Sequence, residues 1–249
     1  MIRSWLSVPA DNAKKLASLA SVPADAVVLD LAHGMDEDTR RTARAQAVEW
    51  LASRRQQVVS SNSPARWVRI SGLETPHWRD DLVAVMPGAP TGIILTRALG
   101  PQQVQLLASD IYELEQANRL EHGSVAIIPQ VGESPAAAID LQRFAQETHP
   151  RLAGLAWSAM GLAESLGATR LYNPRGEWSD PLRLVRAATL LTARSKGLMA
   201  IETAHYDAKD AESMARAAHA ARADGFTGMV AIHPRQVTAI NRAFGARSE

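Results

Sequence analysis

The chain has 249 residues, 46% of them hydrophobic, and its 27 basic and 26 acidic side chains leave a formal charge of +1. This balance excludes a strongly basic nucleic-acid-binding protein, and no apolar run approaches the roughly 18 residues of a membrane span. The absence of cysteine excludes disulfides, thiolate metal sites and cysteine nucleophiles. We therefore expect a cytoplasmic globular protein with no nucleic-acid or membrane partner.

Short apolar runs bounded by turn residues alternate along the chain with segments of helical periodicity. The predicted strands are 4–8, 26–31, 67–70, 92–95, 125–131, 152–157, 198–201 and 229–232. The predicted helices between and after them include 36–54, 102–119, 136–147, 181–194, 208–223 and 234–244. A segment rich in Gly, Pro, Asn and Arg, 167–180, is expected to cover one end of the fold as a loop.

Eight βα units in about 250 residues are typical of a TIM (β/α)8 barrel, an α/β fold. The strands are apolar and β-branched, as expected for parallel strands that are buried on both faces. The chain has no Gly-x-Gly-x-x-Gly or Walker loop that would favour a nucleotide-binding sheet. No linker divides it. We therefore predict a single domain spanning residues 1–249.

Active sites of TIM barrels lie at the C-terminal ends of the strands, so the polar residues that follow each apolar run are the candidates. They are Asp30, Arg69, Arg97, Gln130 with Glu133, Ser158, Glu202 and His233. A mouth with several arginines among scattered carboxylates suits a small anionic ligand, such as a carboxylic acid or a phosphorylated cofactor.

Each of these assignments has a structural alternative that the sequence leaves open. Asp30 is also suited to capping the turn that follows it, or to pairing with Arg69. His233 precedes a proline where a helix is expected to begin, and there it would serve as a cap. Glu202 is also suited to bracing Arg69 or Arg97 without touching a ligand.

Lysine is scarce, and its positions bear on the chemistry. Only four of the basic residues are lysines, namely Lys14, Lys15, Lys196 and Lys209. Three of them fall on predicted helices and Lys196 precedes its strand, whereas a Schiff-base aldolase needs a lysine near a strand's C-terminal end. The remaining common route to carbon–carbon bond chemistry is then a divalent metal that polarises a carbonyl, held by two convergent carboxylates.

Five segments resemble the citrate lyase β subunit-like proteins of the HpcH/HpaI aldolase and malyl-CoA lyase superfamily. They are 3–11, 24–31, 68–70, 152–156 and 225–237, the last containing Ala-Ile-His-Pro-Arg-Gln. The resemblance implies a TIM barrel that forms a homo-oligomer, a trimer or a multiple of one. It also implies Mg²⁺ and substrates that are 2-oxo acids, 3-hydroxy diacids or acyl-CoA thioesters.

The resemblance also assigns roles to individual residues. Arg69 stands at the position of the family arginine that grips the substrate carboxylate, and Asp30 matches the first aspartate of an Asp-Leu-Glu-Asp motif. Gly132 and Gly161 replace the two carboxylates that hold the metal in the family, and Glu133 follows one position late. Because Mg²⁺ usually needs protein carboxylates, these departures predict altered or absent metal binding, with Glu133 the remaining candidate ligand.

Two functions follow, and the sequence does not decide between them. The first is a carbon–carbon lyase or aldolase, with Asp30, Arg69 and Glu202 as catalytic residues and with either a displaced metal site or a metal-free acid–base pair supplying the catalysis. Arg69, Arg97, Ser158 and His233 would then bind the substrate. The second is a catalytically inactive relative that binds a small anion or a partner subunit through Arg69. Hydrolysis of a CoA thioester is a third possibility that no spacing selects.

Overall fold

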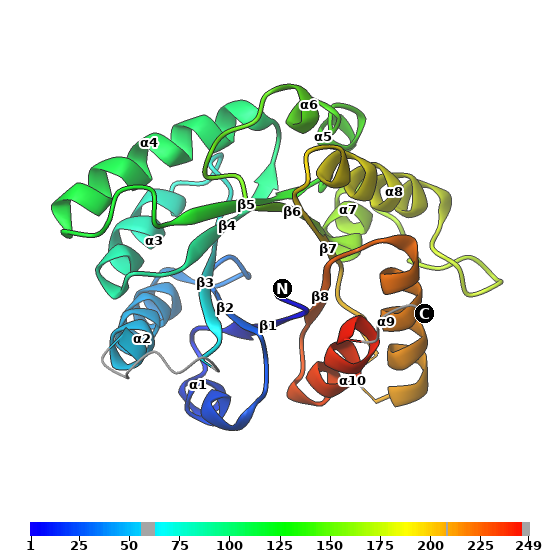
Figure 1. Cartoon of the computed structure of the whole chain (residues 1–249), viewed down its shortest axis with the longest axis horizontal. Coiled ribbons are helices and arrows are strands. Elements are labelled where there is room, and N and C mark those ends of the chain that lie inside the picture. The colour runs from blue at the N-terminus through cyan, green and yellow to red at the C-terminus, as the bar shows by residue number, and fades with distance from the viewer. Residues whose placement is uncertain (56–62, 208, 246–249) are drawn as a thin grey trace.

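The computed structural model describes residues 1–55, 63–207 and 209–245 and forms a closed barrel of eight parallel strands in chain order (Figure 1). The strands are β1 (Ser4–Pro9), β2 (Ala26–Asp30), β3 (Ala65–Ile70), β4 (Gly92–Ala98), β5 (Ala126–Val131), β6 (Gly154–Trp157), β7 (Met199–Glu202) and β8 (Gly228–Ala231). All eight predicted strands are present, and the predicted TIM barrel is confirmed.

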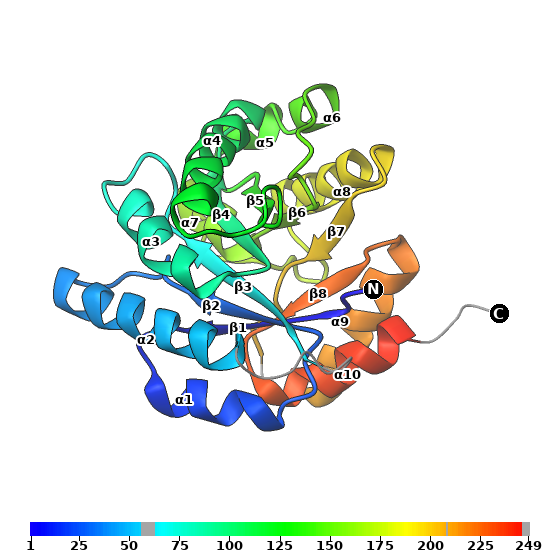
Figure 2. The same cartoon turned by 60° about the vertical axis from the view of Figure 1, so that its left-hand side comes forward.

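Helices surround the barrel on its outer side (Figures 1 and 2). They are α1 (Ala13–Ser18), α2 (Glu37–Arg55), α3 (Trp78–Val85), α4 (Pro101–Ala117), α5 (Pro135–Ile139), α6 (Arg143–Gln146), α7 (Ala159–Leu166), α8 (Asp180–Ser195), α9 (Ala211–Asp224) and α10 (Pro234–Gly245). Short 3₁₀ turns follow α1 and α3. Among the described residues, no helix combines the length and apolar character needed to cross a membrane.

Two predicted helices differ in extent. The segment 136–147 was expected to be one helix, but it forms α5 and α6, because the backbone leaves the helical conformation after Ile139. The helix expected over 208–223 begins only at Ala211, so Lys209 lies in the loop after β7 rather than on a helix. Lys209 is exposed there and does not line the main cavity described below.

The barrel interior is filled by alternate residues of each strand, because successive side chains of a strand point to opposite faces. The inner core consists of Trp5, Ala26, Val28, Trp67, Ile94, Ile128, Ala156 and Ile201. The Trp5 and Trp67 rings meet edge to face with centroids 5.1 Å apart. Gly92 accommodates them, because a Cβ at this position would overlap the Trp67 ring. The two tryptophan rings therefore fill the barrel interior below the C-terminal ends of the strands.

The segment 167–180 lies between α7 and α8 (Figure 1). Tyr172 and Trp178 form an isolated antiparallel bridge, and their rings stack with centroids 4.5 Å apart. Trp178 also packs edge to face on Trp157, the last residue of β6. The loop therefore packs on the C-terminal end of a barrel strand, where it was expected.

A buried ion pair holds the beginning of β5. Both Glu115 carboxylate oxygens pair with the Arg151 guanidinium, at 2.6 and 2.7 Å, and they also accept hydrogen bonds from the backbone N–H groups of Gly123 and Val125. Burial alone would raise the pKa of Glu115, but Arg151 and these two N–H groups hold it below its usual range. This pair fixes the entry of the strand that carries Gln130.

We predict that Glu115→Gln lowers the free energy of unfolding by about 3 kcal/mol near neutral pH, because it leaves Arg151 without its buried anion. Glu113→Gln, an exposed change on the same helix, should alter it by less than about 0.5 kcal/mol. Because the folded pKa of Glu115 is lowered, the stabilisation is present above the usual glutamate pKa and is lost as pH falls through the folded value. Denaturant titrations that give both variants equal stability would contradict this account.

Candidate active site

The upper layer of the barrel interior is polar. Each residue of this layer lies two positions after a residue that belongs to the inner core or packs against it, in the C-terminal half of its strand or just beyond the strand's end. They are Ser7, Asp30, Arg69, Thr96, Gln130, Ser158, Thr203 and Ile232. Together with neighbouring loop residues they line a cavity of about 750 Å³. The alternation that builds the core therefore also builds the site above it.

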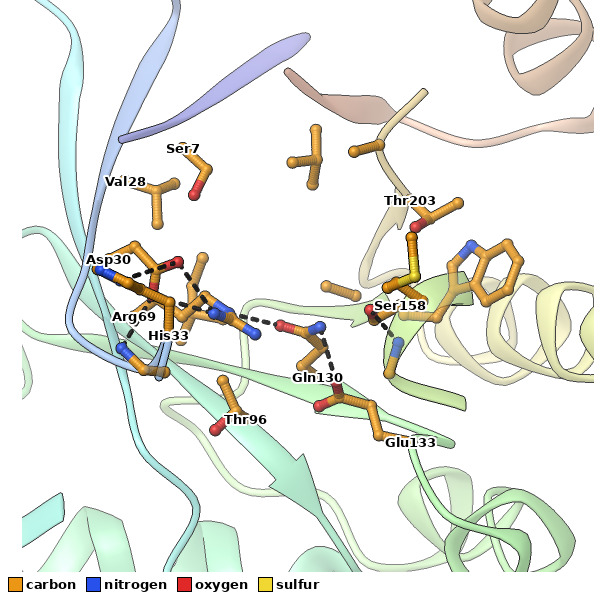
Figure 3. A pocket seen from close by; sticks show the side chains of 18 of the residues that line it. Ser7, Val28, Asp30, His33, Arg69, Thr96, Gln130, Glu133, Ser158 and Thr203 are labelled. Atoms are coloured by element: carbon orange, nitrogen blue, oxygen red, sulfur yellow. Dashed lines mark hydrogen bonds and ion pairs between the residues drawn. The ribbon is translucent and has the colours of Figure 1, made fainter. Parts of the chain in front are cut away.

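A chain of hydrogen bonds crosses this cavity (Figure 3). Arg69 Nη1 lies 3.0 and 3.1 Å from the two carboxylate oxygens of Asp30. Arg69 Nε donates to Gln130 Oε1 at 2.9 Å, and Gln130 Nε2 donates to Glu133 Oε1 at 3.1 Å. The backbone N–H of Arg97 donates to Glu133 Oε2 at 2.6 Å. Two carboxylates are thus linked through one guanidinium and one amide.

The charges in this chain perturb one another. Burial alone would lower the pKa of Arg69, but the negative charges of Asp30 and Glu133 raise it above its usual value. Burial raises the pKa of Glu133, and the positive charge of Arg69 offsets this only in part. Arg69 is therefore a permanent cation in the cavity. No hydrogen bond within the described part of the chain uses its third nitrogen, Nη2.

Glu133 reaches the cavity although it follows the family position by one residue. Gly132, directly before it, has a φ of +70°, a conformation that glycine adopts without strain. The chain turns there, and Glu133 lines the cavity beside Gln130 instead of pointing to the outer face. A Cβ at Gly132 would in addition overlap a methyl group of Val185.

Glu202, predicted to be catalytic, lies on the other side of its strand. It follows the inner-core residue Ile201 by one position and does not line the cavity. Its carboxylate accepts hydrogen bonds from Trp157 Nε1 at 2.7 Å and from Arg186 Nε on α8 at 2.6 Å. Arg186 also pairs with Asp224 at the end of α9. Glu202 therefore braces an arginine, as the structural alternative predicted, but the arginine is Arg186.

His233, predicted to bind substrate, is exposed and is not among the residues that line the cavity. Its Nδ1 accepts a hydrogen bond from the backbone N–H of Arg235 at 3.2 Å, in the first turn of α10. Ile232 is the residue that faces the cavity from this strand end. The structure therefore matches the capping alternative for His233.

Arg97 and Ser158 do line the cavity, in different ways. Arg97 has a left-handed φ of +53° at a register shift in β4, and its exposed side chain lies 3.0 Å from the Glu74 carboxylate. Ser158 is the N-cap of α7, where its hydroxyl accepts a hydrogen bond from the Gly161 N–H at 3.0 Å. Arg97 therefore has its charge at the mouth, and Ser158 has its hydroxyl inside.

Sequence reasoning missed Ser7, Thr96, Thr203 and Tyr206 and gave Gln130 no role, although all five line the cavity. The signal that would have found most of them is the alternation of inward and outward side chains along each strand. Counting two residues on from each inner apolar residue selects Ser7, Thr96, Gln130 and Thr203 and rejects Glu202. Tyr206 lies on a loop and has no such signal.

The donor set does not fit a divalent metal. Within the residues that the structure describes, no three His, Asp or Glu side chains come together as a metal site. Both Asp30 oxygens contact Arg69, and both Glu133 oxygens accept hydrogen bonds from protein donors. Mg²⁺ takes oxygen ligands with near-octahedral geometry, whereas here Asp30 pairs directly with a guanidinium and Glu133 is held by an amide and a backbone N–H group.

The family model of the HpcH/HpaI aldolase/citrate lyase proteins matches residues 3–234 of this chain. The chain belongs to this family. A citrate lyase subunit beta-like protein of Mycobacterium tuberculosis is 29% identical over 96% of this chain and 78% of its own length. The mitochondrial citramalyl-CoA lyase of Rattus norvegicus is 25% identical over 97% and 71%. The resemblance inferred from sequence is confirmed, and these relatives are named after lyase reactions.

Solved structures agree. The citrate lyase β subunit of M. tuberculosis superposes with a TM-score of 0.78 at 28% identity, covering 98% of this chain and 97% of that one. The same subunit in complex with oxaloacetate and magnesium gives a TM-score of 0.77, also at 28% identity and with 98% and 96% covered. A further M. tuberculosis structure holds magnesium, acetoacetate and coenzyme A, with a TM-score of 0.74 at 27% identity, over 98% and 81% of the two chains.

We predict that Glu202→Gln lowers the free energy of unfolding by about 3 kcal/mol, because it removes the buried anion from Arg186 and leaves only the half-exposed Asp224 as its anionic partner. It should leave the affinity for small carboxylates unchanged. Glu212→Gln, which breaks the exposed pair with Arg216 on α9, serves as control and should cost about 0.5 kcal/mol or less. Denaturation and acetoacetate titration of both variants check this; weaker acetoacetate binding in Glu202→Gln alone would return that residue to the site.

Proposed function

We propose that this chain is a carbon–carbon lyase that acts on a small carboxylate, of the 2-oxo acid or 3-hydroxyacyl-CoA type, held on Arg69. The observation that carries the proposal is the Arg69 guanidinium inside the cavity, fixed by Asp30 and Gln130 with Nη2 left unused within the described chain. A guanidinium held in place can bind a carboxylate or an enolate oxygen, because charge-assisted hydrogen bonds are stronger where water is partly excluded.

The reaction itself needs few groups. When a 3-hydroxyacyl substrate is cleaved, a base takes the hydroxyl proton, the carbon–carbon bond breaks, and its electron pair forms an enolate that takes up a proton at carbon. Asp30 is the carboxylate placed beside Arg69 to accept and return that proton. Arg69 would stabilise the enolate charge. Glu202 has no part in this scheme, because it lies outside the cavity.

The chemistry proposed here is altered relative to that of the magnesium-bound relatives. Because Asp30 and Glu133 already have protein partners, no step is assigned to a metal. The catalytic set then consists of Asp30 and Arg69, with Ser158 as a further hydroxyl inside the cavity. We propose that turnover is slow and does not depend on added Mg²⁺.

Arg97 supports a ligand with a second anionic group. Its side chain is 63% exposed and its partner Glu74 is 38% exposed, so this pair is weak and exchangeable. A distal carboxylate or a CoA phosphate could compete with Glu74 for Arg97. A CoA thioester as substrate is therefore part of the proposal.

A catalytically inactive binding protein is the second candidate. The observation that favours it is the absence, in the described segments, of a metal donor set like those expected of active relatives. The two functions share Arg69 as anchor and differ only in turnover. A cytoplasmic location and assembly into a homo-oligomer, a trimer or a multiple of one, stay predictions that sedimentation and fractionation can test.

We predict that the purified protein cleaves citramalyl-CoA, malyl-CoA or oxaloacetate at a measurable rate that Mg²⁺ or EDTA changes less than about twofold. Arg69→Ala should lower kcat/KM by about 100-fold or more, because it removes a preorganised charge-assisted donor. Arg235→Ala, an exposed change outside the cavity, serves as control. Product formation is followed by thioester absorbance and carbonyl trapping.

The outcomes separate the two candidates. Absence of turnover on all three compounds, combined with acetoacetate binding in calorimetry that Arg69→Ala weakens by about 10-fold to 100-fold, would leave the binding protein. Equal acetoacetate binding by the wild type and Arg69→Ala would remove Arg69 as anchor and contradict both.

A further inference from the structure

The Glu133 carboxylate lies directly against Gly161, the third residue of α7. A Cβ built at Gly161 would overlap Glu133 Oε1 and would lie 3.2 Å from the Ser158 hydroxyl. By contrast, a Cβ at Gly34, which lines the same cavity, would meet no atom within 4 Å. The space that any side chain at position 161 requires is therefore already taken by Glu133.

Three changes depend on one another in this corner of the cavity. Gly132 adopts the left-handed backbone that turns Glu133 inward, and Gly161 leaves the room that the Glu133 carboxylate fills. Gln130 Nε2 and the Arg97 N–H then hold its two oxygens. A carboxylate therefore lies in this corner of the cavity although residues 132 and 161 are both glycines.

The position of Glu133 also affects the orientation of Arg69. Gln130 has its amide oxygen on Arg69 Nε and its amide nitrogen on Glu133 Oε1. Because an amide that gives its N–H to Glu133 must present its oxygen to Arg69, Glu133 fixes the orientation of Gln130 and thereby the guanidinium plane. Glu133 is in this sense a positioning residue for Arg69.

We infer that the cavity holds its anionic ligand on the Arg69 guanidinium without a divalent metal, and that Glu133, seated in the space beside Gly161, positions that guanidinium. The ligand part of this inference rests on the proposed function, whereas the Glu133–Gly161 part does not. Arg69 supplies the positive charge that a metal would otherwise bring, and Gln130 couples it to Glu133.

A thermodynamic cycle tests the packing without any ligand. Gly161→Ala should lower the melting temperature by about 5 °C, because the methyl group displaces Glu133. In a Glu133→Ala background the same change should cost much less, since the overlapping carboxylate is gone. Gly34→Ala is the matched control and should be silent in both backgrounds. An equal loss from Gly161→Ala with and without Glu133 would overturn the packing argument.

Metal binding is tested with Mn²⁺ as a paramagnetic probe and acetoacetate as the ligand. We expect no stoichiometric Mn²⁺ site by electron paramagnetic resonance, and an acetoacetate affinity that EDTA and Mg²⁺ change less than about twofold. A bound Mn²⁺ that Glu133→Gln abolishes, or acetoacetate binding that requires Mg²⁺, would overturn the inference.

The positioning role has its own readout. Glu133→Ala should weaken acetoacetate binding about tenfold, as expected when one hydrogen-bonded partner in a buried network is lost. Glu133→Gln keeps the shape and an oxygen for the Arg97 N–H, but it places an amide N–H against the Gln130 N–H, so it should weaken binding to a similar extent. Wild-type affinity in Glu133→Gln would show that the orientation of Gln130 does not depend on Glu133. Wild-type affinity in Glu133→Ala would overturn the role. If acetoacetate binds neither with nor without Mg²⁺, the proposed function fails, while the melting and Mn²⁺ measurements still decide the inference.

Discussion

The constraint that shapes this molecule is the alternation of side chains along the strands of a closed barrel. Only every second residue can point inward, and the lower inward positions are filled by Trp5, Trp67 and the apolar residues around them. The next inward position on each strand has no apolar layer above it, so it faces the cavity. Asp30 and Arg69 are functional candidates because of this register, and Glu202 is a structural residue for the same reason.

Within that register, a single cation organises the polar layer. A guanidinium in a cavity must have anionic or polar partners, and Arg69 has Asp30 on one nitrogen and Gln130 on another. Asp30 neutralises the charge of Arg69, whereas Gln130 connects Arg69 to Glu133 through a second hydrogen bond. Two carboxylates can therefore stay in one cavity although only one is paired directly. The arrangement favours an incoming anion over an incoming metal cation, because the carboxylate oxygens already contact protein donors and, among the described residues, Arg69 Nη2 has no hydrogen-bond partner.

The sequence alone was sufficient for the fold, because eight apolar runs with β-branched residues and intervening helical periodicity have few other solutions. It was also sufficient for Asp30, Arg69 and Ser158 as cavity residues. It failed for Glu202 and His233, because these residues were selected for lying near a strand end, without regard to the alternation of inward and outward side chains along the strand. The place of Glu133 depended on a backbone turn at Gly132, which a motif comparison registers only as a misplaced glutamate.

The position of the Glu133 carboxylate depends on glycine at two other positions of the chain. A glutamate moved by one residue would normally leave the cavity, and a left-handed glycine is what returns it. The returned carboxylate needs room, which Gly161 provides. The inward position of Glu133 therefore depends on glycine at both 132 and 161, the two positions where the resemblance places the family's metal-binding carboxylates. Both oxygens of the Glu133 carboxylate are hydrogen-bonded, and Gln130 connects Glu133 to Arg69, so the two glycines bear on the geometry of the anion site itself.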